Sequence, residues 1–334
     1  MKTKILKTRP ASAGSKNILA AAKIIRSGGL VAFPTETVYG LGANAFNPRA
    51  VKKIFSAKGR PFDDPLIVHI CSERQLYSLA SHIPLMAKIL IGKFWPGPLT
   101  LVLRKTEKIP KITTGGLNTV AVRMPSHSVA LELICAAGVP VAAPSANTFG
   151  RPSPTSARDV LEDLDGKIGA VLDGGRTRIG VESTVLDLSG KTPELLRPGK
   201  IMLEELEKTI GKIRVHPLVR MRAPKGRNHK KSAARSPGLA YRHYAPAAEV
   251  ILVQGPPRRT ATKIKKIRAG LAGKKVVVLK TAGKSKENIA ARLFSEFRDA
   301  DRKGADVIIV QGVDEKGLGL AVMNRVRKAS SKTM

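Results

Sequence analysis

Several features are scarce in this sequence of 334 residues. Aromatic residues make up only 4% of the chain, so the core must be built from Val, Leu, Ile and Ala. No apolar run approaches the roughly 20 residues that a membrane-spanning helix needs. The basic N-terminal segment 1–10 is not followed by the apolar stretch of a secretory signal. The sequence therefore predicts a globular protein that has no membrane anchor and is not secreted.

Cysteine is almost absent. The two residues, Cys71 and Cys135, stand among apolar neighbours, and neither has a second ligand at metal-binding spacing. Two buried thiols in a reducing compartment are typical of a cytoplasmic protein. We therefore expect free thiols, a cytoplasmic location and no protein-held metal.

Acidic residues are also scarce, with 25 Asp and Glu against 59 Lys and Arg, which gives a net charge of +34. Such an excess favours polyanionic partners, namely nucleotides, RNA or both. A nucleotide pocket would use only ~3 to 5 of these cations. The total charge therefore does not distinguish an enzyme acting on nucleotides from an RNA-binding protein.

The first two hundred residues alternate short apolar strands with amphipathic helical patterns, which predicts an α/β domain with an open, twisted mixed sheet. No acidic residue occurs between Glu207 and Glu249, and the cations there are interspersed with proline and glycine, which is typical of a linker. From Glu249 onward, strand–helix units predict a small Rossmann-like parallel-sheet domain. The predicted boundaries are 1–211 for the first domain, 212–248 for the basic linker and 249–334 for the second domain.

The expected elements follow from these patterns. Strands are expected at residues 30–33, 66–70, 100–104, 119–123, 139–143, 170–173, 184–188, 195–197, 250–253, 275–279 and 306–310. Helices are expected at residues 47–57, 73–80, 84–94, 127–137, 156–164, 203–210, 260–271, 287–297 and 318–327. The hydroxyl- and glycine-rich segment 34–42 is expected to be a loop at the carboxyl end of a strand, where open α/β sheets bind ligands.

The sequence lacks the two common phosphate-binding signatures. The segment Gly175–Gly180 has the glycine spacing of a phosphate-binding loop, but Val181-Glu182 stands where Lys-Ser or Lys-Thr is required. No Gly-x-Gly-x-x-Gly follows a predicted strand either. A nucleotide would therefore need a different binding device.

Lys58-Gly-Arg60 supplies a candidate for that device. Two cations one residue apart can face one polyanion, and the glycine between them lets the backbone approach it closely. The chain then enters an apolar strand that ends in His69, while Pro144-Ser-Ala-Asn147 places a hydroxyl and an amide directly after another apolar run. These residues favour a nucleotide-handling enzyme, although each segment taken alone is also typical of an ordinary turn.

Eight segments stand in an order that resembles one known family. They are Pro34-Thr-Glu-Thr-Val-Tyr-Gly-Leu-Gly42, Lys58-Gly-Arg-Pro61, Pro65-Leu-Ile-Val-His69, Trp95-Pro-Gly-Pro-Leu-Thr100, Ala121-Val-Arg-Met-Pro125, Ala143-Pro-Ser-Ala-Asn147, Glu182-Ser-Thr184 and Leu196-Arg-Pro-Gly199. The family is the YrdC-like threonylcarbamoyl-AMP synthases. Ser236-Pro-Gly-Leu-Ala-Tyr-Arg-His-Tyr-Ala-Pro246 is similar to the linker of its long, two-domain branch.

The resemblance implies a specific reaction. L-threonine, bicarbonate (or CO2) and ATP would be joined into threonylcarbamoyl-AMP with release of pyrophosphate, with Mg2+ bound through the ATP phosphates. A partner transferase would then move the threonylcarbamoyl group to the adenosine beside the anticodon of tRNA. Direct contact of the basic surface with RNA is a further expectation.

The resemblance also assigns roles to residues. The catalytic set would be Lys58, Arg60, Ser145 and Asn147. L-threonine would be held by Thr37, His69, Arg123, Ser183 and the backbone near Ala143. ATP would be held by Arg60, Asp64, Thr119, Ser145, Ser153, Arg197 and, from the linker, Tyr241.

The chemistry of these residue types agrees with the assignment. A carbamate oxygen must attack an α-phosphate that is also anionic, and Lys58 and Arg60 can neutralise both groups. Arg123 suits a bidentate grip on the carboxylate of the amino acid. No acidic cluster is available as a cage for Mg2+. No covalent nucleophile is needed, because positioning and electrostatics suffice.

Two features depart from the family's pattern. Asp64 stands where the family usually has asparagine, and a carboxylate has no donor for a phosphate or base unless it is protonated or bridged by Mg2+. The substitution would either weaken ATP binding or change a loop contact. The C-terminal domain is short for this branch, which predicts reduced contacts with the first domain.

Two alternatives stay open on the sequence alone. A carbamoyltransferase of the hydrogenase-maturation kind contains a similar domain, but its Cys-x-x-Cys zinc modules and acylphosphatase-like segment are missing here. An RNA-binding or ribosome-associated protein without catalysis would explain the charge. It would not explain Lys58, Arg60, Ser145, Asn147 and Arg197 standing together in one motif set.

Overall fold

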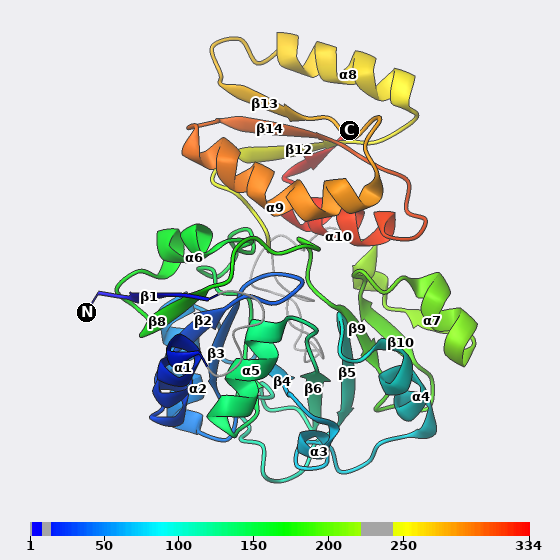
Figure 1. Cartoon of the computed structure of the whole chain (residues 1–334). Coiled ribbons are helices and arrows are strands. Elements are labelled where there is room, and N and C mark those ends of the chain that lie inside the picture. The colour runs from blue at the N-terminus through cyan, green and yellow to red at the C-terminus, as the bar shows by residue number, and fades with distance from the viewer. Residues whose placement is uncertain (1, 9–14, 222–242) are drawn as a thin grey trace.

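A computed structural model describes residues 2–8, 15–221 and 243–334, which form two α/β domains stacked on one another (Figure 1). The larger domain is built on a mixed sheet of eleven described strands, and the smaller on a sheet of four. The predicted fold class is thereby confirmed. The residue boundaries of the linker stay a prediction, because most of the segment 212–248 lies outside the described residues.

The large sheet mixes parallel and antiparallel neighbours, as expected. Its strands in spatial order are β1 (Lys4–Lys7), β8 (Ala170–Asp173), β2 (Val31–Phe33), β3 (Gly40–Asn44), β7 (Val141–Ala142), β4 (Ile67–His69), β6 (Thr119–Arg123), β5 (Leu99–Arg104), β9 (Thr184–Asp187), β10 (Glu194–Arg197) and β11 (Arg214–Val215). The helices of this domain are α1 (Lys16–Arg26), α2 (Pro48–Lys58), α3 (Glu73–Leu76), α4 (Leu85–Phe94), α5 (Ser128–Ala137), α6 (Ala157–Leu164) and α7 (Leu203–Ile210), followed by the 3-10 turn η1 (Pro217–Val219).

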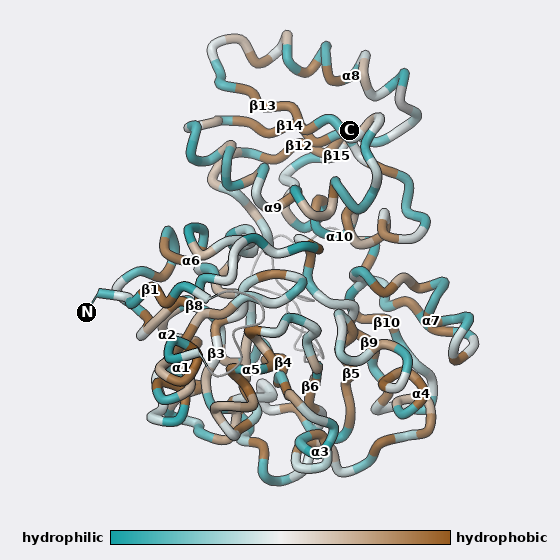
Figure 2. Tube along the Cα trace, in the orientation of Figure 1, coloured by the Kyte–Doolittle hydropathy of each residue, from teal (hydrophilic) through white to brown (hydrophobic). Residues whose placement is uncertain are grey.

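The small sheet is entirely parallel in the order β13 (Val276–Leu279), β14 (Val307–Gln311), β12 (Glu249–Val253) and β15 (Lys332–Thr333). Helix α8 (Pro257–Ala269) covers its outer face, while α9 (Lys286–Arg302) and α10 (Gly319–Ala329) lie between this sheet and the larger domain (Figure 1). Figure 2 shows hydrophobic residues following the strands of both sheets, so each domain has its own core.

Capping residues fix where α2 begins and where it ends, and its C-terminal end positions the segment Lys58-Gly-Arg60. The Asn47 side chain accepts hydrogen bonds from the N–H groups of Arg49 and Ala50, and Pro48 occupies the first turn. Gly59 stops the helix with a left-handed φ of 63°. Lys58 is therefore the last helical residue, and the chain turns directly after it.

The segment 34–42 is not wholly a loop, because its last three residues begin β3, which pairs antiparallel with β2. The glycines that suggested a loop are needed for close packing. A Cβ atom on Gly42 would lie 2.8 Å from the Phe33 ring and 2.7 Å from Val141. The expected helix at 73–80 is also shorter, since α3 ends at Leu76.

The expectation of two free, buried thiols is wrong. Cys71 and Cys135 form a disulfide with a Cα–Cα distance of 5.7 Å, and Cys135 is exposed. Cys71 follows β4 and Cys135 lies on α5, so the fold brings together two residues 64 positions apart in sequence. Spacing along the chain does not reveal such a pair.

The expectation of reduced contacts between the domains is also wrong. Leu320 of α10 belongs to the hydrophobic core of the larger domain. Arg298 and Arg325 of the smaller domain are fully buried and form ion pairs with Asp163 and Glu182 of the larger one. Among the described helices, none is both long and apolar enough to cross a bilayer.

Candidate active site

A cavity lies where several strands of the large sheet end. It is lined by residues from the turn after β2, the carboxyl ends of β4, β6 and β10, the loop after β7, the turn before β9 and the end of the linker. The lining residues are Thr35, Thr37, Val38, Gly40, Arg60, Ile67, His69, Arg123, Ala143, Pro144, Ser145, Glu182, Ser183, Arg197, His243 and Tyr244. The fold therefore brings together eight of the fourteen residues that the sequence predicts for the site.

Lys58 lies beside this cavity and is buried. Its ammonium group donates hydrogen bonds to the backbone carbonyl oxygens of Ser145, at 2.5 Å, and of Asn147. Burial, and secondarily the charge of Arg60, lowers the pKa of Lys58 well below its usual range. A ligand that brings negative charge would favour the charged form of this lysine.

Arg60 lines the cavity, and its guanidinium is fixed by contacts on the side away from the cavity. Its Nη2 lies 2.9 Å from Oδ2 of Asp64 and donates to the carbonyl oxygen of Pro65 at 3.0 Å. Asp64 is completely buried and is not among the residues that line the cavity. The acidic residue at the family's asparagine position thus pairs with the cation predicted to bind phosphate.

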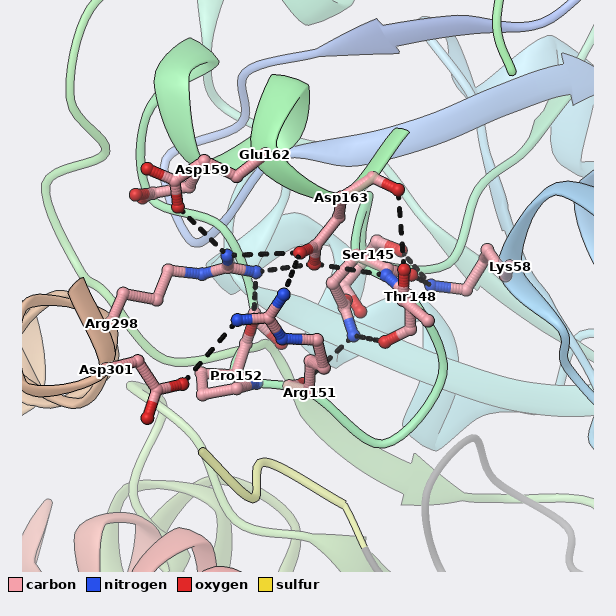
Figure 3. Close-up of polar contacts among 12 residues, drawn as sticks. Lys58, Ser145, Thr148, Arg151, Pro152, Asp159, Glu162, Asp163, Arg298 and Asp301 are labelled. Atoms are coloured by element: carbon pink, nitrogen blue, oxygen red, sulfur yellow. Dashed lines mark hydrogen bonds and ion pairs between the residues drawn. The ribbon is translucent and has the colours of Figure 1, made fainter. Parts of the chain in front are cut away.

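The loop after β7 carries Ser145 and Asn147, the hydroxyl and amide residues predicted for the site. Ser145 lines the cavity. Asn147 lies just behind it and donates from Nδ2 to the carbonyl oxygens of Thr148, at 2.7 Å, and Arg151, at 3.0 Å. Figure 3 shows Lys58 next to Ser145 and Thr148 of this loop. The amide of Asn147 therefore shapes its own loop.

A second polar group forms around Arg123, at the end of β6. Its Nη1 donates to Oγ1 of Thr37 at 3.0 Å, and its Nη2 lies 2.7 Å from Oε2 of Glu36. Thr37 in turn shares a hydrogen bond of 2.8 Å with Thr35. Two of the five residues predicted to hold the amino acid, Thr37 and Arg123, are thus in direct contact, with Glu36 as an acidic neighbour that the sequence did not single out.

Ser183 and Arg197 complete another side of the cavity. Arg197 donates to both the carbonyl oxygen and the hydroxyl of Ser183, each at 3.0 Å. The same hydroxyl meets Oγ1 of Thr100 at 2.8 Å. A residue predicted to bind threonine and a residue predicted to bind ATP are therefore linked by direct hydrogen bonds.

His69 ends β4, where it pairs with Val141 of β7, and both His69 and Ala143 line the cavity. Burial, followed by the charge of Arg123, lowers the pKa of His69 to about 3. The imidazole is therefore neutral at physiological pH. It can donate or accept a hydrogen bond but does not supply a cation.

Ser153 is buried behind the cavity and hydrogen bonds to Oε1 of Glu182 at 2.5 Å. The other carboxylate oxygen of Glu182 pairs with Nε of Arg325 at 2.7 Å. Lys328, one turn further along α10, is also buried, and its pKa is lowered to about 7 by burial and then by Arg325 and Arg197. The smaller domain therefore places cations at the back of this site.

The end of the linker also reaches the cavity. His243 and Tyr244 line it, and Tyr244 stacks on Phe294 of α9 with ring centroids 5.2 Å apart. Tyr241, the linker residue predicted to contact ATP, lies outside the described residues. Thr119 is described and opens β6, half-buried, but it is not among the residues lining the cavity.

The described residues contain no cluster of three or more metal-ligating side chains. Three carboxylates stand near the cations of the site, and each of them, Glu36, Asp64 and Glu182, is paired with an arginine. These donors do not fit a protein cage for Mg2+. A metal that arrived on the phosphates of a nucleotide would be compatible with them.

Comparison with known proteins is consistent along the whole chain. The Sua5/YciO/YrdC family model, described as telomere recombination, matches residues 23–199, and the model described as the threonylcarbamoyl-AMP synthase C-terminal domain matches residues 201–331. The chain belongs to the threonylcarbamoyl-AMP synthase family. This membership agrees with the resemblance found in the sequence motifs.

Curated members of the synthase family match over nearly their full length. The threonylcarbamoyl-AMP synthase of Pyrococcus abyssi is 56% identical, with 94% of each chain covered. That of Bacillus subtilis is 46% identical, with 96% of this chain and 94% of the relative covered. The crystal structure of P. abyssi Sua5 complexed with L-threonine superposes with a TM-score of 0.94 at 53% identity, covering 99% of this chain and 100% of that one.

Sequence reasoning missed several charged residues around the site. Glu36 stood inside a recognised motif but had no assigned role, and the pairing of Arg325 with Glu182 depends on a contact between domains. The only sequence signal for His243 was the Tyr-Arg-His-Tyr cluster at residues 241–244. Lys328 gave no signal, because a lysine in a polar helix looks like a surface residue.

Proposed function

We propose that this protein is an L-threonylcarbamoyladenylate synthase, which condenses L-threonine, bicarbonate or CO2, and ATP into threonylcarbamoyl-AMP and pyrophosphate. It is a nucleotidyltransferase acting in the threonylcarbamoyladenosine modification of tRNA. The observation that carries the proposal is one cavity lined by all five residues predicted for L-threonine and by three of those predicted for ATP, in a chain matched over its length by synthases. Neither the carbamoyltransferase nor the purely RNA-binding alternative accounts for both findings.

The polar groups suggest how the substrates are divided. We assign L-threonine to Thr37, His69, Arg123, Ala143 and Ser183, because the guanidinium of Arg123 suits a carboxylate. We assign ATP to Arg60, Thr119, Ser145, Ser153, Arg197 and Tyr241, with Asp64 acting through its ion pair with Arg60. The link between Ser183 and Arg197 would then lie at the boundary between the two substrates.

The reaction needs two anions to meet. The amine of threonine attacks CO2 and gives up a proton, forming a carbamate. One carbamate oxygen then attacks the α-phosphorus of ATP, and the bond from that phosphorus to the pyrophosphate oxygen breaks. Lys58 and Arg60 would neutralise the approaching anions, with Ser145 and Asn147 at the same end of the cavity. Mg2+, carried on the phosphates, would supply further positive charge.

The test is pyrophosphate release from ATP and bicarbonate in the presence of threonine, serine or no amino acid. Release that depends on threonine and requires Lys58 and Arg60 is the expected result. If the protein binds ATP but releases no pyrophosphate under any of these conditions, the catalytic assignment is wrong. If it neither releases pyrophosphate nor binds ATP, the non-catalytic alternative takes its place.

We further propose a cytoplasmic location and a downstream tRNA threonylcarbamoyl transferase as the acceptor of the product. Direct contact with RNA has a candidate surface on α8, which is exposed and has six cations and no acidic residue. These are Arg258, Arg259, Lys263, Lys265, Lys266 and Arg268. Like charges one turn apart destabilise a helix, and phosphates would relieve that repulsion. RNA binding that weakens with salt, and with Lys263→Gln plus Lys266→Gln, would support this contact.

A further inference from the structure

Arg298 of α9 lies deep in the contact between the two domains, with only 1% of its surface exposed. Its Nη2 lies 2.8 Å from Oδ2 of Asp163, near the end of α6, and the Asp163 side chain is completely buried. Figure 3 shows this pair next to the loop that carries Ser145. A buried arginine that joins two domains beside a candidate active site can influence the geometry of that site as well as hold the domains together.

The pair holds the segment 148–152, which forms one end of the loop 145–152. Oδ2 of Asp163 also accepts the backbone N–H of Thr148 at 3.1 Å, and Oδ1 accepts Nη1 of Arg151 at 2.9 Å. Arg298 itself donates to the carbonyl oxygen of Pro152 at 2.6 Å. Backbone groups at both ends of this five-residue segment are therefore fixed by one ion pair.

The other end of the same loop is held by the candidate catalytic residues. Asn147 donates to the carbonyl oxygens of Thr148 and Arg151. Lys58 donates to the carbonyl oxygens of Ser145 and Asn147 and accepts the N–H of Phe149 on its own carbonyl oxygen, at 2.8 Å. A continuous set of hydrogen bonds thus connects Arg298 in the second domain with Lys58 in the first.

The charges make this connection sensitive to the loss of Arg298. Without it, the buried carboxylate of Asp163 would keep Arg151, which is 39% exposed, as its remaining close cation. A buried ion left without its partner draws in water or moves the groups around it. The groups that would move are the backbone of the loop behind Ser145.

We propose that Arg298 is a positioning residue for the nucleotide half of the active site. Through Asp163 it holds the loop 145–152 so that Ser145 faces the phosphates of ATP in register with Lys58, with Asn147 bracing the loop behind it. The smaller domain thereby helps to build the ATP site without touching the substrate. This inference rests on the proposed function, because it takes ATP as the ligand of that loop.

Arg298→Met tests the proposal, with Arg302→Met as the matched control. Arg302 lies one turn further along α9 and pairs with Asp159 and with Glu162 of α6, the latter at 2.7 Å. In the described part of the chain it makes no hydrogen bond to residues 145–152. The two variants remove the same charge from the same helix, and only one of them disturbs the loop.

The full-length variants are compared by calorimetric binding of ATP and of L-threonine and by the kinetics of pyrophosphate release. Arg298→Met is expected to weaken ATP binding or lower kcat by about tenfold or more, since small displacements of positioned groups are costly. Threonine binding should stay within about twofold of wild type, because Arg298 does not contact that side. Arg302→Met should match wild type in all three measurements.

Asp163→Asn should reproduce the effect of Arg298→Met from the other side of the pair. If Arg298→Met does not fold, as judged by circular dichroism, Arg298→Lys replaces it and should still weaken ATP binding selectively. Equal effects of the Arg298 and Arg302 variants, or parallel loss of both ligands in folded protein, would overturn the inference. If the wild-type chain itself fails to bind ATP, the proposed function fails instead.

Discussion

The guanidinium of Arg60 and the carboxylate of Asp64 form an ion pair of 2.9 Å in which both side chains are buried. Asp64 stands where the resemblance to the family predicts asparagine, and its charge compensates a cation that we assign to the phosphates of ATP. Arg60 is therefore held in place before any ligand arrives. The same carboxylate lies close to where a polyanion would bind.

The Asp64→Asn variant should therefore change the stability of the protein and its affinity for ATP in opposite directions. The ligand-free protein should lose about 2 kcal/mol of unfolding free energy, because a buried cation loses its partner. ATP should bind about tenfold more tightly, because one repulsive charge is gone. Urea unfolding and calorimetry measure the two effects, and the exposed neighbour Asp63→Asn is the control. Weaker ATP binding would mean instead that Asp64 keeps Arg60 in its productive position.

Lys58→Met should abolish the cation that links the end of α2 to the loop carrying Ser145. We expect threonine-dependent pyrophosphate release to fall by about 100-fold or more, as when a preorganised electrostatic contact is removed from an active site. Lys52→Met, on the exposed face of the same helix, should leave the rate unchanged. A Lys58 variant with nearly normal turnover would remove this residue from the catalytic set.

Arg123→Lys tests the amino-acid side. A lysine keeps the charge but cannot contact Thr37, Glu36 and a carboxylate with the same planar geometry. We expect the Kd for L-threonine to rise by about tenfold, with ATP binding unchanged, in calorimetric titrations. The exposed Arg104→Lys on the neighbouring strand β5 serves as the control. An equal loss of ATP affinity would show that the two halves of the site are not separable.

Much of the fold followed from local patterns. Asn47-Pro48 and Gly59 bracket α2 because capping is encoded in a few adjacent residues. The alternation of strands and helices was sufficient for the mixed sheet and the parallel sheet of the second domain. By contrast, the start of β3 was predicted as a loop, because its glycines are explained by the packing of Phe33 and Val141 against them, which no local pattern reveals.

The residues of the candidate site also fall into those that local sequence predicted and those that it did not. Residues in short motifs, such as Lys58 and Ser145, were identified because the functional groups of each motif lie within one short stretch of sequence. Glu182 with Arg325 and Asp163 with Arg298 were not, because each pair joins residues more than a hundred positions apart. Such pairs depend on how the second domain docks, which no local pattern encodes.

His69 predicts a pH dependence of stability. In the unfolded chain this histidine takes up a proton below about pH 6.5, whereas in the folded protein its pKa is about 3. Stability is therefore lost as the pH falls from 6.5 towards 3, by about 1.4 kcal/mol for each pH unit. His69→Gln should flatten this slope in urea unfolding at pH 7, 6 and 5, and the exposed His82→Gln should not. An unchanged slope in the His69 variant would show that the imidazole is accessible to protons.

The disulfide between Cys71 and Cys135 gives the last prediction. It closes a loop with a sequence separation of 64 residues, tying the end of β4 to α5. Cross-links of this kind stabilise mainly by restricting the unfolded chain, so reduction should lower the unfolding free energy by about 2 to 4 kcal/mol. Thermal unfolding with and without dithiothreitol measures the change, and thiol titration of the denatured protein counts the free cysteines.

The double variant Cys71→Ser with Cys135→Ser should resemble the reduced protein and show no response to the reductant. Two titratable thiols before reduction, together with a melting temperature that dithiothreitol does not alter, would rule out the bond. Because the bond lies outside the residues lining the cavity, reduction should leave threonine and ATP binding at 25 °C unchanged.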